Sequence, residues 1–320
     1  MSGLEKLNAT RQPPLVSVIM NCFNGERFLR EAIDSVYAQT WPAWEIVFWD
    51  NASRDNSGDI ARSYDDRLRY FRAERTTPLG EARNLAFARA RGEFIAMLDS
   101  DDIWLTNTLE RLVAGMQDAA REYAVCYGGV RRINVEGQEI GRRVPKARRG
   151  NLFGDFLHHF DIMPCASMVR RSVLVENHHG FDPSLTTSED VCFFMTLAVD
   201  HPFHSLPECV ACYRIHEGAL TNKSISQWAD EWKYTVMQIL DSHPGIDDRY
   251  RSGFRHILAR VDYYRARHLM HSGDRSGARR LLQRNITVDS RYLGLFLILM
   301  LPPKVWDLAH SWYHKRSQFS

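Results

Sequence analysis

The sequence predicts an α/β fold, in which helices cover both faces of a mostly parallel sheet, followed by a wholly helical C-terminal region. Two observations support this prediction. Over the first hundred residues, short and almost uninterrupted apolar runs alternate with stretches of helical spacing. Such runs are typical of strands in a parallel sheet that is buried on both faces. After about residue 224, apolar residues recur three or four positions apart, which favours helices.

The first half of the chain contains four expected strands with helices between them. The strands are predicted at residues 15–20, 46–49, 68–71 and 94–98. A helix is predicted at residues 28–37 from its apolar spacing, a second around Ile60, and a third, rich in alanine, from Gly80 onward. The pair Asn24-Gly25 turns the chain after the first strand, and Pro42 ends the first helix.

Beyond residue 123 the pattern is less regular. Strands are expected at residues 125–130 and 209–215, a turn at 136–138, and helices at 153–160 and 191–199. Residues 277–286 form an expected basic amphipathic helix. These elements predict an N-terminal tail at 1–13, an α/β domain at 14–220 that divides into residues 14–105 and 106–220, and a helical region at 221–320.

Composition narrows the possible classes of protein. The 320 residues include 41 Lys and Arg against 39 Asp and Glu, so the overall charge gives no case for nucleic-acid binding. Six cysteines are scattered along the chain, which is unlike a disulfide framework. The polar N-terminus does not resemble a signal peptide. The longest apolar run, residues 293–301, is too short to span a bilayer as a helix. We therefore expect a cytoplasmic protein.

Acidic side chains stand where two of the expected strands end. Asp50 follows the second strand, and Asp99, Asp101 and Asp102 follow the fourth. In an open parallel sheet, ligands bind at the carboxyl ends of the strands. Asp99 and Asp101 point the same way in extended backbone, and paired carboxylates suit Mg²⁺ or Mn²⁺ that also binds substrate phosphates. The alternative is that these acids favour the start of the next helix.

Four segments, in this order and spacing, resemble family 2 glycosyltransferases. They are residues 16–26 (VSVIMNCFNGE), 46–55 (IVFWDNASRD), 80–86 (GEARNLA) and 97–104 (MLDSDDIW). The resemblance is dense over residues 14–105, thinner to about residue 220, and absent beyond. It implies a GT-A fold whose first half binds a nucleoside-diphosphate sugar and whose second half binds the acceptor.

The resemblance also implies roles for residues that bind the donor. Asp50 matches the carboxylate that contacts the base, Asn24 and Glu26 lie near the base and ribose, and Arg83 lines the nucleotide pocket. Many members have two acids after the second strand, whereas this chain has Asp50 followed by an asparagine, which can form hydrogen bonds but carries no charge.

The same resemblance makes residues 99–101 an Asp-x-Asp motif. Asp99 and Ser100 would bind the nucleotide sugar, and Asp101, with Asp99, would hold the Mn²⁺ or Mg²⁺ cofactor. His216 matches a histidine that reaches the metal or the diphosphate in relatives. For a lone histidine, a purely structural role is the alternative.

The expected catalytic base is Asp190. Relatives of the inverting type often carry a Glu-Asp pair at the start of a helix, and here Glu189-Asp190 precedes an apolar helical stretch. Inversion needs one base to deprotonate the acceptor hydroxyl while the metal stabilises the leaving diphosphate. The alternative is a Ser188 N-cap with acids in the first helical turn, and both can hold together.

The predicted function is inverting, metal-dependent transfer of a sugar to a hydroxyl of a glycan or lipid-linked acceptor in surface polysaccharide synthesis. A non-catalytic nucleotide-sugar or carbohydrate-binding module is the alternative, and a sugar nucleotidyltransferase, which would want a glycine-rich basic loop, is a weaker one. Peripheral contact with an anionic membrane could involve a basic loop at 131–149, four arginines of residues 275–284 and the apolar residues 293–301. A buried helix at 293–301 is the alternative.

Overall fold

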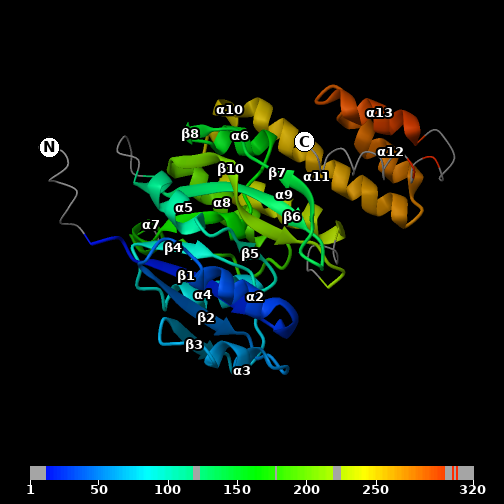
Figure 1. The fold of residues 1–320 in the computed structure, drawn as a ribbon. Helices are drawn as coiled ribbons and strands as arrows, with labels where there is room; N and C mark the ends of the chain where they lie inside the picture. Colours follow the sequence, from blue (N-terminus) through cyan, green and yellow to red (C-terminus); the bar gives the residue numbers. More distant parts are fainter. Residues whose placement is uncertain are drawn as a thin grey trace, which may run out of the picture.

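The computed structural model describes residues 12–117, 123–176, 179–218 and 225–299, together with residues 305 and 308. Its first half alternates strands and helices as predicted (Figure 1). These elements are β1 (Val16–Cys22), α2 (Glu26–Tyr37), β2 (Trp44–Asp50), α3 (Ser57–Arg62), β3 (Leu68–Arg72), α4 (Leu79–Phe87) and β4 (Phe94–Met97).

The second half contains more strands than the sequence indicates. Its elements are β5 (Ile103–Trp104), α5 (Thr108–Met116), β6 (Val125–Ile133), β7 (Glu139–Arg143), β8 (Arg148–Gly150), α6 (Phe153–His158), the 3-10 turn η1 (Pro164–Ala166), β9 (Ser167–Arg170), α7 (Arg171–Glu176), α8 (Glu189–Asp200) and β10 (Phe203–Arg214). The strand expected at 209–215 is the end of the much longer β10. The expected turn at 136–138 joins β6 to its antiparallel neighbour β7.

The C-terminal region is helical throughout its described residues, as predicted. It consists of α9 (Ile225–Ser242), α10 (Ile246–Arg249), α11 (Arg251–His271), α12 (Arg275–Arg284) and α13 (Ser290–Ile298). The boundary expected near residue 220 lies outside the described residues.

One mixed sheet runs through the molecule in the order β3-β2-β1-β4-β9-β6-β10-β5. Strands β3, β2, β1 and β4 are mutually parallel, and β6 is parallel to β10, whereas β9 pairs antiparallel with β4 and with β6. The mostly parallel sheet is therefore confirmed. Because β1, β2 and β4 run the same way, the loops after them emerge at one edge.

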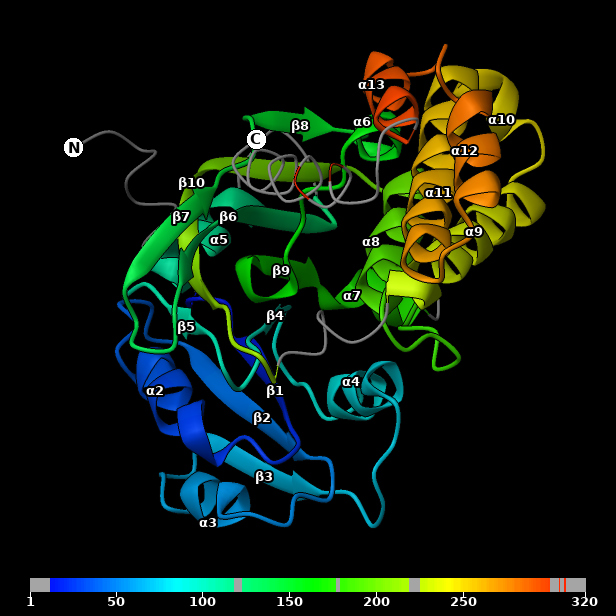
Figure 2. The same ribbon diagram turned by 90° about the vertical axis from the view of Figure 1, so that its right-hand side faces the viewer.

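Apolar side chains are buried on both sides of the sheet. On one side, α2 and α5 supply residues such as Leu29 and Leu112. On the other side a continuous cluster includes Phe194 of α8, Trp232 of α9 and Phe254 of α11. Figure 2 shows α8, α9 and α11 side by side. Helices α9 and α11 thus share the core of the α/β part, while α11, α12 and α13 enclose a smaller separate cluster.

The structure changes two expectations, one for the basic stretch 131–149 and one for the apolar residues 293–301. The basic stretch 131–149 is not a loop, because it forms the end of β6 and the strands β7 and β8. Helix α13 is neither wholly buried nor wholly exposed: Leu295 and Leu299 are buried, whereas Leu293 and Leu297 are exposed. No helix among the described residues is long and apolar enough to cross a membrane.

Candidate functional site

The loops after β1 and β2 interlock at the carboxyl edge of the sheet. The Asn24 side-chain oxygen accepts a hydrogen bond from the backbone N–H of Arg54 at 2.8 Å, and a Glu26 carboxylate oxygen accepts one from the N–H of Asn56 at 3.0 Å. Asn24 has a φ of 53°, a left-handed conformation that asparagine tolerates better than most residues. Asn24 and Glu26 therefore shape the loop after β2 as well as the loop that carries them.

Gly25 leaves room for the predicted donor-binding residue Ser100. A Cβ at this position would lie 2.8 Å from the Cys22 sulfur and 3.0 Å from the Ser100 hydroxyl oxygen. The loop after β1 and the acidic turn after β4 thus approach so closely that a side chain at residue 25 would push them apart.

Asp50, the last residue of β2, has a fully buried carboxylate. One oxygen accepts from the backbone N–H of Ser53 at 2.7 Å. The other accepts from the Tyr70 hydroxyl at 2.6 Å and from the Arg72 guanidinium at 2.5 Å. A ligand could reach this carboxylate directly only by displacing one of these donors. In this arrangement, Asp50 holds the turn after β2 and fixes the place of Arg72.

Arg83 joins the two halves of the site. Its guanidinium is buried on α4 and donates to an Asp99 carboxylate oxygen at 3.0 Å and to a Glu189 carboxylate oxygen at 2.9 Å. Burial alone would lower the pKa of Arg83, but Asp99 and Glu189 raise it above its usual value. One charged group therefore connects the acidic turn after β4 to the first turn of α8.

Asp101 faces His216. A carboxylate oxygen of Asp101 lies 2.9 Å from the Nε2 atom of His216. Burial and the nearby Asp99 carboxylate raise the pKa of Asp101. The structure thus places His216 against Asp101 and the Asp99 charge near Asp101, which concentrates negative charge there.

This donor set fits a divalent ion that is completed by a substrate. Within the described ranges, no three His, Cys, Asp or Glu side chains are grouped so as to hold a metal ion by themselves. Mg²⁺ and comparable hard cations in proteins are often held by one or two carboxylates together with substrate phosphates. The like-charged pair Asp99 and Asp101, 33–34% exposed in its side chains, would be stabilised by such a cation.

Asp190 lies in the first turn of α8, beside Glu189. The residue as a whole is partly exposed, and one carboxylate oxygen accepts a hydrogen bond from the N–H of Val191 at 2.8 Å. Burial, and then the charge of Glu189, raise the pKa of Asp190 to about 7, while Arg83 opposes the rise. A carboxylate with such a pKa can accept a proton near neutral pH.

The structure adds residues that sequence reasoning missed. Arg214, buried at the end of β10, donates to the backbone oxygen of Asp101 at 2.9 Å, and its own N–H donates to Asp102 at 2.8 Å. Its nearness to His216 in the chain was the available signal. Glu189 stands next to Asp190 in the chain, but its ion pair with Arg83 has no local sequence signal.

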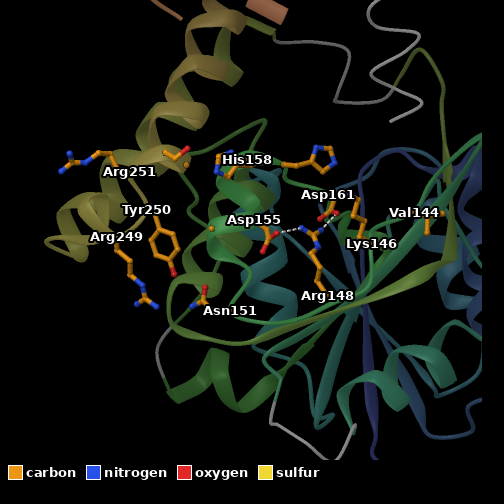
Figure 3. Close-up of a pocket in the computed structure, with 14 residues that line it drawn as sticks. Val144, Lys146, Arg148, Asn151, Asp155, His158, Asp161, Arg249, Tyr250 and Arg251 are labelled. Carbon is orange, nitrogen blue, oxygen red and sulfur yellow. Dashed lines mark hydrogen bonds and ion pairs between the residues drawn. The ribbon is translucent and has the colours of Figure 1, made fainter. Parts of the chain in front are cut away.

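A separate cavity of about 850 Å³ lies between β8, α6 and the start of α11. Figure 3 shows Arg148 between Asp155 and Asp161, with which it forms ion pairs. None of the predicted site residues lines this cavity. The carboxylate cluster at the sheet edge, and not this cavity, is the candidate site.

Comparisons with known proteins show the family of this chain. The model of a family described as "Glycosyl transferase family 2" matches residues 17–177. TuaG of Bacillus subtilis (strain 168), which is named as a teichuronic acid biosynthesis glycosyltransferase, is 29% identical over 70% of this chain and 85% of its own. WfgD of Escherichia coli, named as a UDP-Glc:alpha-D-GlcNAc-diphosphoundecaprenol beta-1,3-glucosyltransferase, is 27% identical over 68% of this chain and 84% of its own.

Solved structures show the same fold. Residues 1–349 of TarS from S. aureus, in complex with UDP-GlcNAc, superpose with a TM-score of 0.64 at 18% identity, covering 94% of this chain and 92% of that one. The mannosyltransferase PcManGT from Pyrobaculum calidifontis, in complex with GDP-Man and Mn²⁺, gives a TM-score of 0.56 at 16% identity, covering 94% and 88%.

Proposed function

The chain belongs to glycosyl transferase family 2, and from this premise we propose that it transfers a sugar, with inversion, from a nucleoside diphosphate to a hydroxyl of a glycan or lipid-linked acceptor. The names of TuaG and WfgD support a place in polysaccharide synthesis, and the name of WfgD supports a lipid-linked acceptor. TuaG and WfgD are named as glycosyltransferases, so they give no support to a non-catalytic binding module or to a sugar nucleotidyltransferase.

The bridge made by Arg83 is the observation that carries the proposal. It brings the acidic turn after β4, where a donor diphosphate would bind, together with the turn that carries Asp190. Donor and base must lie this close, because the acceptor hydroxyl attacks the anomeric carbon while it loses its proton.

The donor would bind at the carboxyl edge of the sheet. We assign Asn24, Glu26 and Ser100 to the walls around the base and ribose, and Arg83 and Asp99 to the inner part of the pocket. Asp50 would contribute to donor binding indirectly, by holding the turn after β2, because its carboxylate is buried and already accepts hydrogen bonds.

Asp101 and Asp99, with His216, would hold Mn²⁺ or Mg²⁺. The ion would supply positive charge to the leaving diphosphate. The buried arginine Arg214 fixes the backbone of Asp101 through its hydrogen bond to the carbonyl oxygen, so the acidic turn is held in place before any ligand binds.

Asp190 would act as the general base. Its pKa of about 7 leaves a large fraction ionised at neutral pH, while the carboxylate remains basic enough to accept a proton. No covalent intermediate is needed for inversion, so a single base suffices.

We also propose that the protein contacts a membrane surface, where a lipid-linked acceptor would lie. Leu293 and Leu297 are exposed on α13, and Arg280 and Arg284 are exposed on the neighbouring helix α12. Exposed apolar and basic side chains on two helices in contact can bind the surface of an anionic bilayer. A lipid-linked acceptor would make such contact useful.

Donor binding and turnover test the proposal directly. UDP-GlcNAc, UDP-glucose and GDP-mannose are screened by thermal shift with and without Mn²⁺, since a ligand of the folded state raises its stability. We expect one of them to raise the melting temperature in a Mn²⁺-dependent manner, and Asp101→Ala to remove the shift. Asp190→Asn should keep the shift and lose transfer to GlcNAc-diphosphoundecaprenol. Wild-type transfer by Asp190→Asn would refute the assignment of the base.

A further inference from the structure

The turn that leads into α8 is held by a single carboxylate from the C-terminal helices. Glu231 lies on α9, 41 positions after Asp190. One of its oxygens accepts from the backbone N–H and the hydroxyl of Thr186, both at 2.9 Å. The other accepts from the N–H and hydroxyl of Thr187 at 3.0 and 2.8 Å and from the N–H of Ser188 at 2.7 Å.

These five bonds occupy the carboxylate fully. A carboxylate offers about four lone-pair positions, so no capacity remains for another partner. Burial alone would raise the pKa of Glu231, but the hydrogen bonds from Thr186 and Thr187 lower it. The group is therefore ionised at neutral pH, and charge-assisted hydrogen bonds of this kind are stronger than neutral ones.

The same helix holds the start of the segment. The Tyr234 hydroxyl of α9 donates to Asp182 at 2.8 Å. On the other side, the Asn84 side chain of α4 donates to the backbone oxygen of Phe181 at 2.7 Å and accepts from its N–H at 2.8 Å. Contacts from α4 and α9 thus fix the start of the segment 181–188, and the hydrogen bonds to Glu231 fix its end.

We propose that Glu231 is a positioning residue for transfer: its carboxylate fixes the 186–188 turn and thereby sets where Asp190 lies relative to the donor. This inference rests on the proposed function, in which Asp190 is the base. Ser188, the N-cap residue of α8, makes no side-chain capping hydrogen bond, and its backbone N–H donates to Glu231. The carboxylate from α9 therefore holds the residue from which α8 starts.

The geometry predicts which substitution disturbs the turn. In Glu231→Gln, one carboxylate oxygen becomes an NH₂ group that cannot accept from the backbone N–H groups of the turn. At least one of these donors then loses its partner, and the turn relaxes. Displacement of a catalytic group by about 1 Å can cost roughly a hundredfold in rate, while the donor pocket around Asp99 is not in contact with the changed atoms.

The experiment compares Glu231→Gln with the wild type and with Asp230→Asn, a matched control on the adjacent position of α9 whose carboxylate is exposed and pairs with Arg265. The donor is the nucleotide sugar with the largest Mn²⁺-dependent thermal shift among UDP-GlcNAc, UDP-glucose and GDP-mannose. We expect a tenfold to hundredfold lower kcat in Glu231→Gln, with a donor Kd within about twofold of the wild type, and no change in Asp230→Asn. An unchanged kcat in the folded Glu231→Gln protein would overturn the inference.

Two further variants separate positioning from stability and from failure of the proposed function. Thr187→Val removes one of the five bonds and keeps the backbone donors, so it should fold and lose a smaller part of kcat. Adding Glu231→Gln should leave the residual transfer rate of Asp190→Asn unchanged, because both act through one group. A further decrease of that residual rate would contradict this role. A fully active Asp190→Asn would reject the base itself, whereas an inactive Asp190→Asn beside a fully active Glu231→Gln would reject only the inference.

Discussion

At the scale of single residues, charge within the site is balanced by Arg83. Its partner Glu189 is as buried as the arginine, whereas Asp99 is partly exposed. A buried ion pair adds little net stability, but removing one partner leaves an uncompensated buried charge. Arg83 therefore compensates the buried charge of Glu189, and it also lowers the pKa of Asp190.

Substitution of Arg83 should affect both the stability of the fold and the pKa of Asp190. Arg83→Met should lower the free energy of unfolding by about 3 kcal/mol or more, because Glu189 stays buried without a partner. Urea denaturation measures this, and Arg30→Met, an exposed arginine of α2, should change it by less than about 0.5 kcal/mol. Equal effects of the two substitutions would show that the buried pair contributes nothing.

The rate of transfer should depend on the ionisation of Asp190. With a pKa of about 7, the base is protonated in acid, so kcat/KM should fall tenfold for each pH unit below about 7. A pH series of initial rates at constant Mn²⁺ measures this. A rate that is flat from pH 5.5 to 8.5 would rule out Asp190 as the titrating base.

The carboxyl group of Asp190 should also make the stability of the folded protein depend on pH, and this stability should fall where the transfer rate rises. Its pKa in the folded protein lies above the value of about 3.9 for unfolded aspartate, so the folded state binds more protons between these values. Stability therefore decreases as the pH rises from about 4 to 7. Asp190→Asn should unfold at a higher temperature than the wild type at pH 8, and this gain should disappear near pH 4.

At the scale of elements, the predictable strands and helices are those whose own residues are regular. Strand β2 is a continuous buried run, and α2 repeats its buried positions at helical spacing, so both were expected. Strand β7 is mostly exposed and charged, and β5 has two residues. Such strands form because a neighbouring strand offers hydrogen bonds, a tertiary effect that their own residues do not encode.

Helix α13 should mediate contact with anionic membranes. Leu293 and Leu297 are 44% and 54% exposed, and their replacement by serine removes apolar surface that would enter the bilayer. Sedimentation with phosphatidylglycerol vesicles should show about tenfold weaker binding of the double variant. Leu258→Ser, on the exposed face of α11, is the control and should bind like the wild type. Equal sedimentation of all three proteins would exclude α13 as the contact.

At the scale of the whole molecule, the site combines parts that differ in how visible they are in the sequence. The strand-end acids Asp99 and Asp101 could be predicted, because parallel strands end at one edge of the sheet. The bridge from Arg83 to Glu189 spans 106 positions, and Glu231 contacts its turn across more than 40. Packing of α8 and α9 against the sheet creates both contacts, and no local spacing signals them.

This packing also predicts where the chain can be shortened. Trp232, Val236 and Ile239 of α9 and Phe254 and Ile257 of α11 belong to the same buried cluster as the sheet, whereas α12 and α13 pack on α11 in a cluster of their own.

A chain that ends at residue 224 should therefore aggregate, because it exposes the apolar side of α8 and also lacks Glu231. A chain that ends at residue 272 should fold and keep its Mn²⁺-dependent thermal shift with the donor sugar. Solubility, binding of an apolar dye and the urea dependence of unfolding measure the difference. Cooperative unfolding of the 1–224 chain with donor affinity like that of the full protein would mean that the C-terminal helices form a separate domain. The shared core argues against that outcome, because removing α9 and α11 withdraws large aromatic and aliphatic side chains from a close-packed interior.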